Sequence, residues 1–126
     1  MTSDGSPYGR FQRALKTGNV NLALAAAREL PKINLSDSLR LCLLLRDTDL
    51  FERAALRWHG RYCREVVAIE LDEAQAVLAC LAALLGPRAE VAARTLCALL
   101  DPVQVRSARQ ELAAWTEKSR PQPELR

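Results

Sequence analysis

Apolar residues recur along this chain at intervals of three and four positions, the spacing that places side chains on one face of an α-helix. Seven segments show this pattern, and they are separated by short stretches with Gly, Pro, Asn or Asp, as is typical of turns and helix ends. No segment shows the alternation of apolar and polar residues that predicts a strand. We therefore predict helices at about residues 8–17, 20–30, 37–46, 50–67, 73–85, 87–100 and 103–118.

The expected helix ends carry recognisable signals. Gly18 and Pro31 are expected to end the first two helices, because glycine adopts the left-handed conformation and proline has no amide hydrogen. The run LCLLL at residues 41–45 is apolar on every side, which marks a central helix. Short polar side chains can bind the free amide groups of a first helical turn. We expect such N-terminal caps from Ser36, from Asp49 with Glu52, and from Asp72 with Gln75.

The composition indicates one domain with a core made mainly of Leu, Ala and Val. The chain has 126 residues, of which 49% are hydrophobic and 5% aromatic, enough for one hydrophobic core. Both ends lack the apolar pattern, and we expect disorder at residues 1–7 and 119–126. The prediction is a single all-helical domain over residues 8–118, an all-α compact bundle or short stack of about seven helices.

Two segments of the chain share an outline. LCLLLRDTDLFERAALRW at 41–58 and LCALLDPVQVRSARQELAAW at 96–115 each contain an apolar helix with one Cys, an acid-marked turn and an Arg-bearing helix that ends in Trp. The outline fits either a duplicated helical hairpin or a chance likeness, because Leu- and Ala-rich helices share such patterns readily.

A second likeness is local. KTGNVNLALAAARELP, at 16–31, has Gly-Asn at a turn, the small residues Ala23 and Ala27 on its packing face, and a closing Pro31. It resembles the second half of a tetratricopeptide-type helical hairpin. No second copy follows at the 34-residue period of that family. The resemblance implies only a stack of α-hairpins, a shape commonly used to hold other proteins.

The cysteines and the absence of long apolar runs suggest where the protein works. No N-terminal apolar segment marks export, and no stretch approaches the roughly 20 apolar residues of a membrane span. Cys42, Cys63, Cys80 and Cys97 fall in four different predicted helices and form no CxxC pair. We expect free thiols, buried at 42, 80 and 97 and on a helix border at 63, in a cytoplasmic protein with no membrane partner.

The stretch RWHGRYC at 57–63 holds the only histidine, His59, one helical turn from Cys63. A metal site needs three or four converging ligands, and the other cysteines lie in apolar runs on separate helices. A nucleophilic cysteine needs a base and an orienting group, and no orienting group is apparent here unless Glu52, two turns before, serves. Acidic residues at 47–49 and 70–73 are explained by helix starts, and the chain has no phosphate-binding loop, HExxH or GxSxG motif. We expect no catalytic residue, no metal and no cofactor, and therefore no enzyme.

Four arginines gather on one side of the same predicted helix, opposite an aromatic stripe of Phe51, Trp58 and Tyr62. Arginine binds carboxylates and phosphates through two parallel hydrogen bonds, and the chain has fifteen arginines against three lysines. Asp49 and Glu65 lie four residues from two of these arginines and are placed to pair with them. The candidate partner-binding residues are Arg53, Arg57, Arg61 and Arg64.

This group of four arginines has three interpretations. It is a solvated surface, a site for an acidic protein surface, or a site for nucleic-acid phosphates. A duplex-binding domain is expected to be far more basic than a net charge of +3, or to show a helix-turn-helix. We therefore expect a small, non-enzymatic protein–protein interaction module, an adaptor or scaffold. The alternative is an accessory nucleic-acid-binding protein that uses the same arginines.

Overall fold

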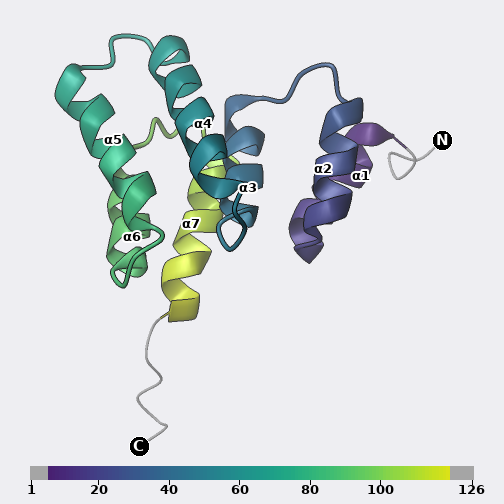
Figure 1. Ribbon diagram of the computed structural model, residues 1–126. Coiled ribbons are helices and arrows are strands. Elements are labelled where there is room, and N and C mark those ends of the chain that lie inside the picture. The colour runs from purple at the N-terminus through teal and green to yellow at the C-terminus, as the bar shows by residue number, and fades with distance from the viewer. Residues whose placement is uncertain (1–5, 120–126) are drawn as a thin grey trace, which may run out of the picture.

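The computed structural model of the protein (Figure 1) describes residues 6–119, and side chains as far as residue 114. The disorder expected at 1–5 and 120–126 lies outside the described residues. The first helix begins at Pro7, and the Oγ of Ser6 accepts a hydrogen bond of 2.9 Å from the amide of Gly9. Proline suits the first helical position, because the amide hydrogen that it lacks would have no partner there.

The described residues form seven helices and no strand, which confirms the predicted all-α fold. Every helix boundary falls within three residues of the prediction. The helices are α1 (Pro7–Thr17), α2 (Val20–Glu29), α3 (Leu35–Leu44), α4 (Phe51–Glu65), α5 (Leu71–Ala83), α6 (Ala89–Leu99) and α7 (Arg106–Ser119).

Helices α3 to α7 form a closed ring around the larger of two cores (Figure 1). Each of these helices packs against the next along the chain, and α7 also packs on α3. The aromatic stripe of α4 faces this core, as its helical periodicity predicts. Trp58 is only 2% exposed; its Nε1 donates a 2.9 Å hydrogen bond to the Leu35 carbonyl, and its ring stacks on Tyr62 with 5.0 Å between centroids. Trp58 therefore fixes α4 against the start of α3.

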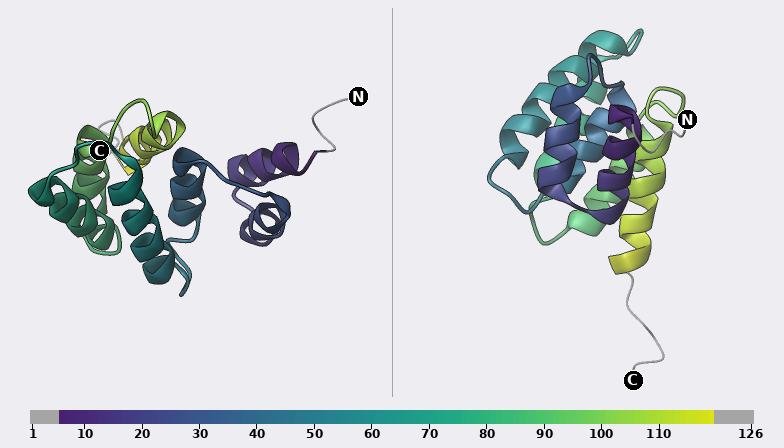
Figure 2. Two further views of the ribbon diagram at one scale, coloured as in Figure 1. Left: turned by 90° about the horizontal axis from the view of Figure 1, so that it is seen from above. Right: turned by 90° about the vertical axis from the view of Figure 1, so that its right-hand side faces the viewer.

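Helices α1 and α2 form a hairpin beside the ring, with a small core of their own (Figure 2). Gly18 adopts the left-handed conformation at φ 77°, and Asn19 caps α2 by accepting a 3.0 Å hydrogen bond from the amide of Leu22. Leu41 and Leu44 of α3 pack against this second core, whereas other α3 residues pack into the first. This confirms the prediction that the third helix is central.

A buried carboxylate joins the hairpin to the ring. Asp37 of α3 is 3% exposed and accepts hydrogen bonds from the Tyr8 hydroxyl at 3.0 Å and the Gln12 amide at 3.2 Å. Arg40 contacts Asp37 at 3.3 Å and Glu111 of α7 at 2.9 Å, and donates to the Gln12 side-chain oxygen at 2.8 Å. Side chains of α1, α3 and α7 thus meet in one polar network.

The predicted cap of α3 was wrong. Asn34, not Ser36, caps this helix, and its side-chain oxygen accepts a 2.7 Å hydrogen bond from the amide of Asp37. Ser36 is instead buried, 2.7 Å from the Ser107 hydroxyl, and accepts a 3.0 Å hydrogen bond from the amide of Ala108. Its hydroxyl joins α3 to α7, a contact that no local pattern reveals.

The two predicted acidic caps were also wrong. Helix α4 follows Leu50 and has no side-chain cap, so Asp49 and Glu52 form no capping box. Helix α5 begins at Leu71, before the expected residue, and its capping box joins Glu70 and Glu73 rather than Asp72 and Gln75. Several acidic residues precede the apolar run here, and the residue with the extended backbone directly before the helix becomes the cap.

Replacing Trp58 with Ala should remove the contact that holds α4 on α3. Loss of a buried Trp costs about 3–5 kcal/mol, a large part of the roughly 5–15 kcal/mol that stabilises a domain. Trp58→Phe keeps an aromatic ring but removes the hydrogen bond to the Leu35 carbonyl, which retains its helical donor, at a cost of about 0.5–1.5 kcal/mol. Denaturant unfolding measures both values, and a Trp58→Ala protein as stable as wild type would contradict this packing.

Candidate functional site

The buried stripe of α4 determines which residues this helix presents outward. Because Phe51, Trp58 and Tyr62 face the core, the opposite side of the helix faces away from it. The structure places all four predicted arginines on this outer side, with Arg53, Arg57 and Arg64 exposed and Arg61 partly exposed.

The four arginines differ in their partners. The Nε of Arg61 lies 2.5 Å from Glu65 Oε2, the ion pair that the four-residue spacing predicts. The other expected pair, between Asp49 and Arg53, does not form within residues 6–119. In the part of the chain that the structure describes, Arg53, Arg57 and Arg64 form no ion pair. We call Arg53, Arg57 and Arg64 the arginine face.

His59 and Cys63 lie together on the flank of α4 that faces α5. His59 Nε2 is 2.7 Å from the Ala74 carbonyl and 3.6 Å from the sulfur of Cys63. A carbonyl only accepts hydrogen bonds, so the short contact requires a proton on Nε2. Among the described residues no group of three His, Cys, Asp or Glu is placed to hold a metal ion. The hydrogen bond from His59 to the Ala74 carbonyl joins α4 to the backbone of α5.

The four cysteines are free thiols, as expected from their spacing. Only Cys42 is fully buried, and this burial raises the pKa of its thiol to about 12. Cys80 and Cys97 are partly exposed, which corrects the expectation that both are buried. Burial raises the pKa of Cys80, and the Cys97 sulfur lies 3.7 Å from the Arg109 carbonyl. The two residues lie on the flanks of α5 and α6 rather than on their core faces.

An apolar groove runs between α4 and α5, with a volume of about 310 Å³. Its floor includes the buried side chains of Phe51 and Leu81, whereas Leu56 and Leu85 are 62% and 48% exposed. The groove is lined by Phe51, Glu52, Ala55, Leu56, Leu78, Leu81, Ala82 and Leu85. We call these eight residues the α4–α5 groove.

Sequence reasoning did not find this groove. The signal that could have revealed it is the absence of charged residues from most of α5: residues 74–87 contain no Asp, Glu, Lys, Arg or His. A helix with one solvent-facing side normally carries charge there. Ala79, Ala82 and Ala83 are exposed on α5 instead.

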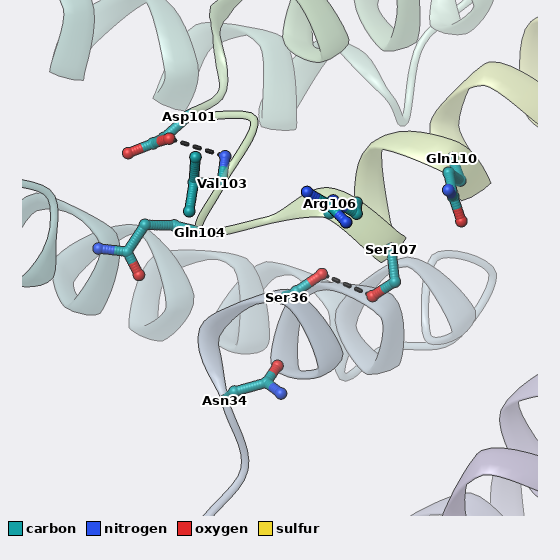
Figure 3. Close-up of a pocket in the computed structure, with 8 residues that line it drawn as sticks. All are labelled: Asn34, Ser36, Asp101, Val103, Gln104, Arg106, Ser107 and Gln110. Atoms are coloured by element: carbon teal, nitrogen blue, oxygen red, sulfur yellow. Dashed lines mark hydrogen bonds between the residues drawn. The ribbon is translucent and has the colours of Figure 1, made fainter.

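A polar hollow of about 640 Å³ lies where α3 and α7 begin (Figure 3). Ser36 and Ser107 point toward each other at its wall, with 2.7 Å between their hydroxyl oxygens, and the carboxylate of Asp101 accepts a 2.9 Å hydrogen bond from the amide of Val103. Every buried side-chain nitrogen and oxygen of the described residues has a hydrogen-bond partner. Ser36 and Ser107 thus join α3 to α7, Gln104 donates to the Glu65 carbonyl, and no buried polar side chain that the structure describes in the hollow is left without a partner.

Comparisons with family models, curated proteins and solved structures give no match to this chain. Residues 16–31, the segment that resembles part of a tetratricopeptide-type hairpin, form the end of α1, the turn at Gly18 and all of α2. None of the helices that the structure describes is long and apolar enough to span a membrane.

Cys42 should react with N-ethylmaleimide far more slowly than Cys63 in native buffer. The Cys42 thiol is buried, and its pKa of about 12 keeps it protonated at neutral pH, whereas the thiolate is the reactive form. Mass spectrometry of quenched, digested samples gives the rate for each residue. All four should react at similar rates in denaturant, and equal native rates for Cys42 and Cys63 would contradict the packing of α3.

Proposed function

We propose that this protein is a non-enzymatic interaction module that binds the acidic surface of another protein through the outer side of α4. The observation that carries the proposal is the arginine face: Arg53, Arg57 and Arg64 project from one side of a well-anchored helix. None of them is neutralised by an acidic side chain of the described residues. Guanidinium groups that are free of internal partners bind carboxylates of another protein with two hydrogen bonds each.

Two features support a binding role rather than catalysis. The nearest approach to a catalytic pair, His59 with Cys63, has its Nε2 hydrogen engaged by the Ala74 carbonyl at 2.7 Å. The α4–α5 groove is almost wholly apolar, with Glu52 as its one titratable side chain. General acid–base chemistry needs at least one positioned proton donor or acceptor beside the substrate. We propose the cytoplasm as the place of action, because four free thiols suit a reducing compartment.

Nucleic acid is the second candidate, since the same arginines suit phosphates. Protein is favoured because Glu52 and Glu65 lie on the same helix, and the net charge of the chain is only +3. Phosphate binding gains from a concentration of positive charge, which these carboxylates reduce.

Replacing Arg53 and Arg57 together with Glu should abolish capture of a nuclease-resistant protein from native lysate. Helical content should not change, because surface substitutions alter stability by no more than about 0.5 kcal/mol each. Circular dichroism checks the fold, and pull-downs with and without nuclease check the partner. The matched control reverses the exposed Arg28 of α2 and Arg106 of α7, and should bind like wild type.

The same variants separate the two candidates. Wild type should not retard DNA or RNA in a gel at about 150 mM salt, where phosphate contacts are weakened. Retardation at micromolar protein that Arg53→Glu with Arg57→Glu abolishes would replace the protein partner with nucleic acid.

A further inference from the structure

The α4–α5 groove and the arginine face share an edge of α4. Leu56 forms the exposed rim of the groove on this helix. Arg53 precedes Leu56 by three residues and Arg57 follows it directly, so both lie about 60–100° further around the helix, on the side away from α5. The apolar α4–α5 groove therefore has two arginines without an ion-pair partner among the described residues, Arg53 and Arg57, along its α4 border.

The opposite border of the groove carries no charge. It is formed by Leu78, Ala82 and Leu85, within the uncharged residues 74–87. Leu85 is 48% exposed, and Ala82 leaves room for a close neighbour. The two borders thus differ: α4 carries Arg53 and Arg57 beside the groove and Glu52 at its end, whereas the α5 border is apolar.

The length of the groove is set by the packing of the two helices, which lie side by side (Figure 1). The hydrogen bond between His59 and the Ala74 carbonyl joins the helices near the α4–α5 loop. Beyond it, the groove extends from Leu56 to Phe51 on α4, and from Leu78 of α5 to Leu85 in the turn that follows this helix. The seven steps from Leu78 to Leu85 span about 10 Å, or two helical turns.

We propose that this groove holds an amphipathic helix of the protein partner, with acidic side chains along the edge that faces Arg53 and Arg57. The inference rests on the proposed function and names the segment that the partner supplies. Apolar side chains spaced i, i+3 or i+4, and i+7 fit a slot two turns long. Acidic residues on one flank only would match the cationic border, and the flank over Leu85 and Ala82 would be apolar or small. Glu52, at the α4 end of the groove, disfavours an acidic residue there.

The test is a selection from a phage-displayed library of 16-residue helical peptides on the immobilised full chain. The double variant Leu56→Ser with Leu85→Ser is used for counter-selection. Both side chains are exposed, so the substitutions should remove the groove's apolar rim without unfolding the protein. Enriched peptides should carry the i, i+3 or i+4, i+7 apolar spacing with Asp or Glu on one flank. The double Leu variant should bind them at least about tenfold more weakly, as should Arg53→Glu with Arg57→Glu.

Two further variants test whether peptide binding depends on the groove itself rather than on the particular Leu substitutions. Ala82→Arg fills the groove rather than emptying it and should also block binding. Leu22→Ser with Val103→Ser removes two exposed apolar side chains elsewhere and should bind like wild type. Circular dichroism melting confirms that each variant is folded.

Several results would overturn the inference. These are the absence of enrichment over the double Leu variant, enriched peptides without an acidic flank, and undiminished binding by Ala82→Arg. Sedimentation that shows a wild-type dimer, lost in the double Leu variant, would assign the groove to a second copy of the chain. Capture of a protein partner that depends on Arg53 and Arg57 but survives Leu56→Ser with Leu85→Ser would refute the groove while the proposed function stands.

Discussion

The burial of Trp58 against the start of α3 is the constraint on which the outer surface depends. Its Nε1 has one acceptor, the Leu35 carbonyl at 2.9 Å, and its ring lies on Tyr62. A rotation of α4 by one residue would leave the buried indole N–H of Trp58 unpaired and move charged side chains toward the core, at a cost of several kcal/mol. The arginine face points outward, and Leu56 borders α5, because Trp58 points inward.

The two cores explain why α3 is apolar on all sides. Leu39, Cys42 and Leu43 pack inside the ring, whereas Leu41 and Leu44 pack on the α1–α2 hairpin. A polar network around Asp37 also links the hairpin to the ring, and the buried Asp37 carboxylate is fully hydrogen-bonded. Buried polar groups weaken a fold when they lack partners, and here the partners come from α1, α3 and α7.

Local periodicity was sufficient to predict what depends on one helix, such as the seven helices and the outward direction of Arg53, Arg57 and Arg64. It failed where a residue's role depends on a distant segment. Ser36 has a typical cap residue's chemistry, but its hydroxyl binds Ser107 and Ala108, over 70 residues away. The α4–α5 groove could not be predicted for the same reason: Leu56 and Leu85 border one slot only because the two helices pack side by side. Partial exposure of Cys80 and Cys97 likewise follows from packing between helices.

Hydrogen exchange of the protein with and without its captured partner tests the docking surface most directly, because it maps protection along the whole described chain. We expect slower amide exchange in the two segments that border the groove, residues 51–57 of α4 and residues 78–85 at the end of α5 and in the turn after it. Exchange in α2 and around Ser107 should stay as in the free protein. Protection confined to the α1–α2 hairpin or to the hollow between α3 and α7, with α4 and α5 unchanged, would contradict it.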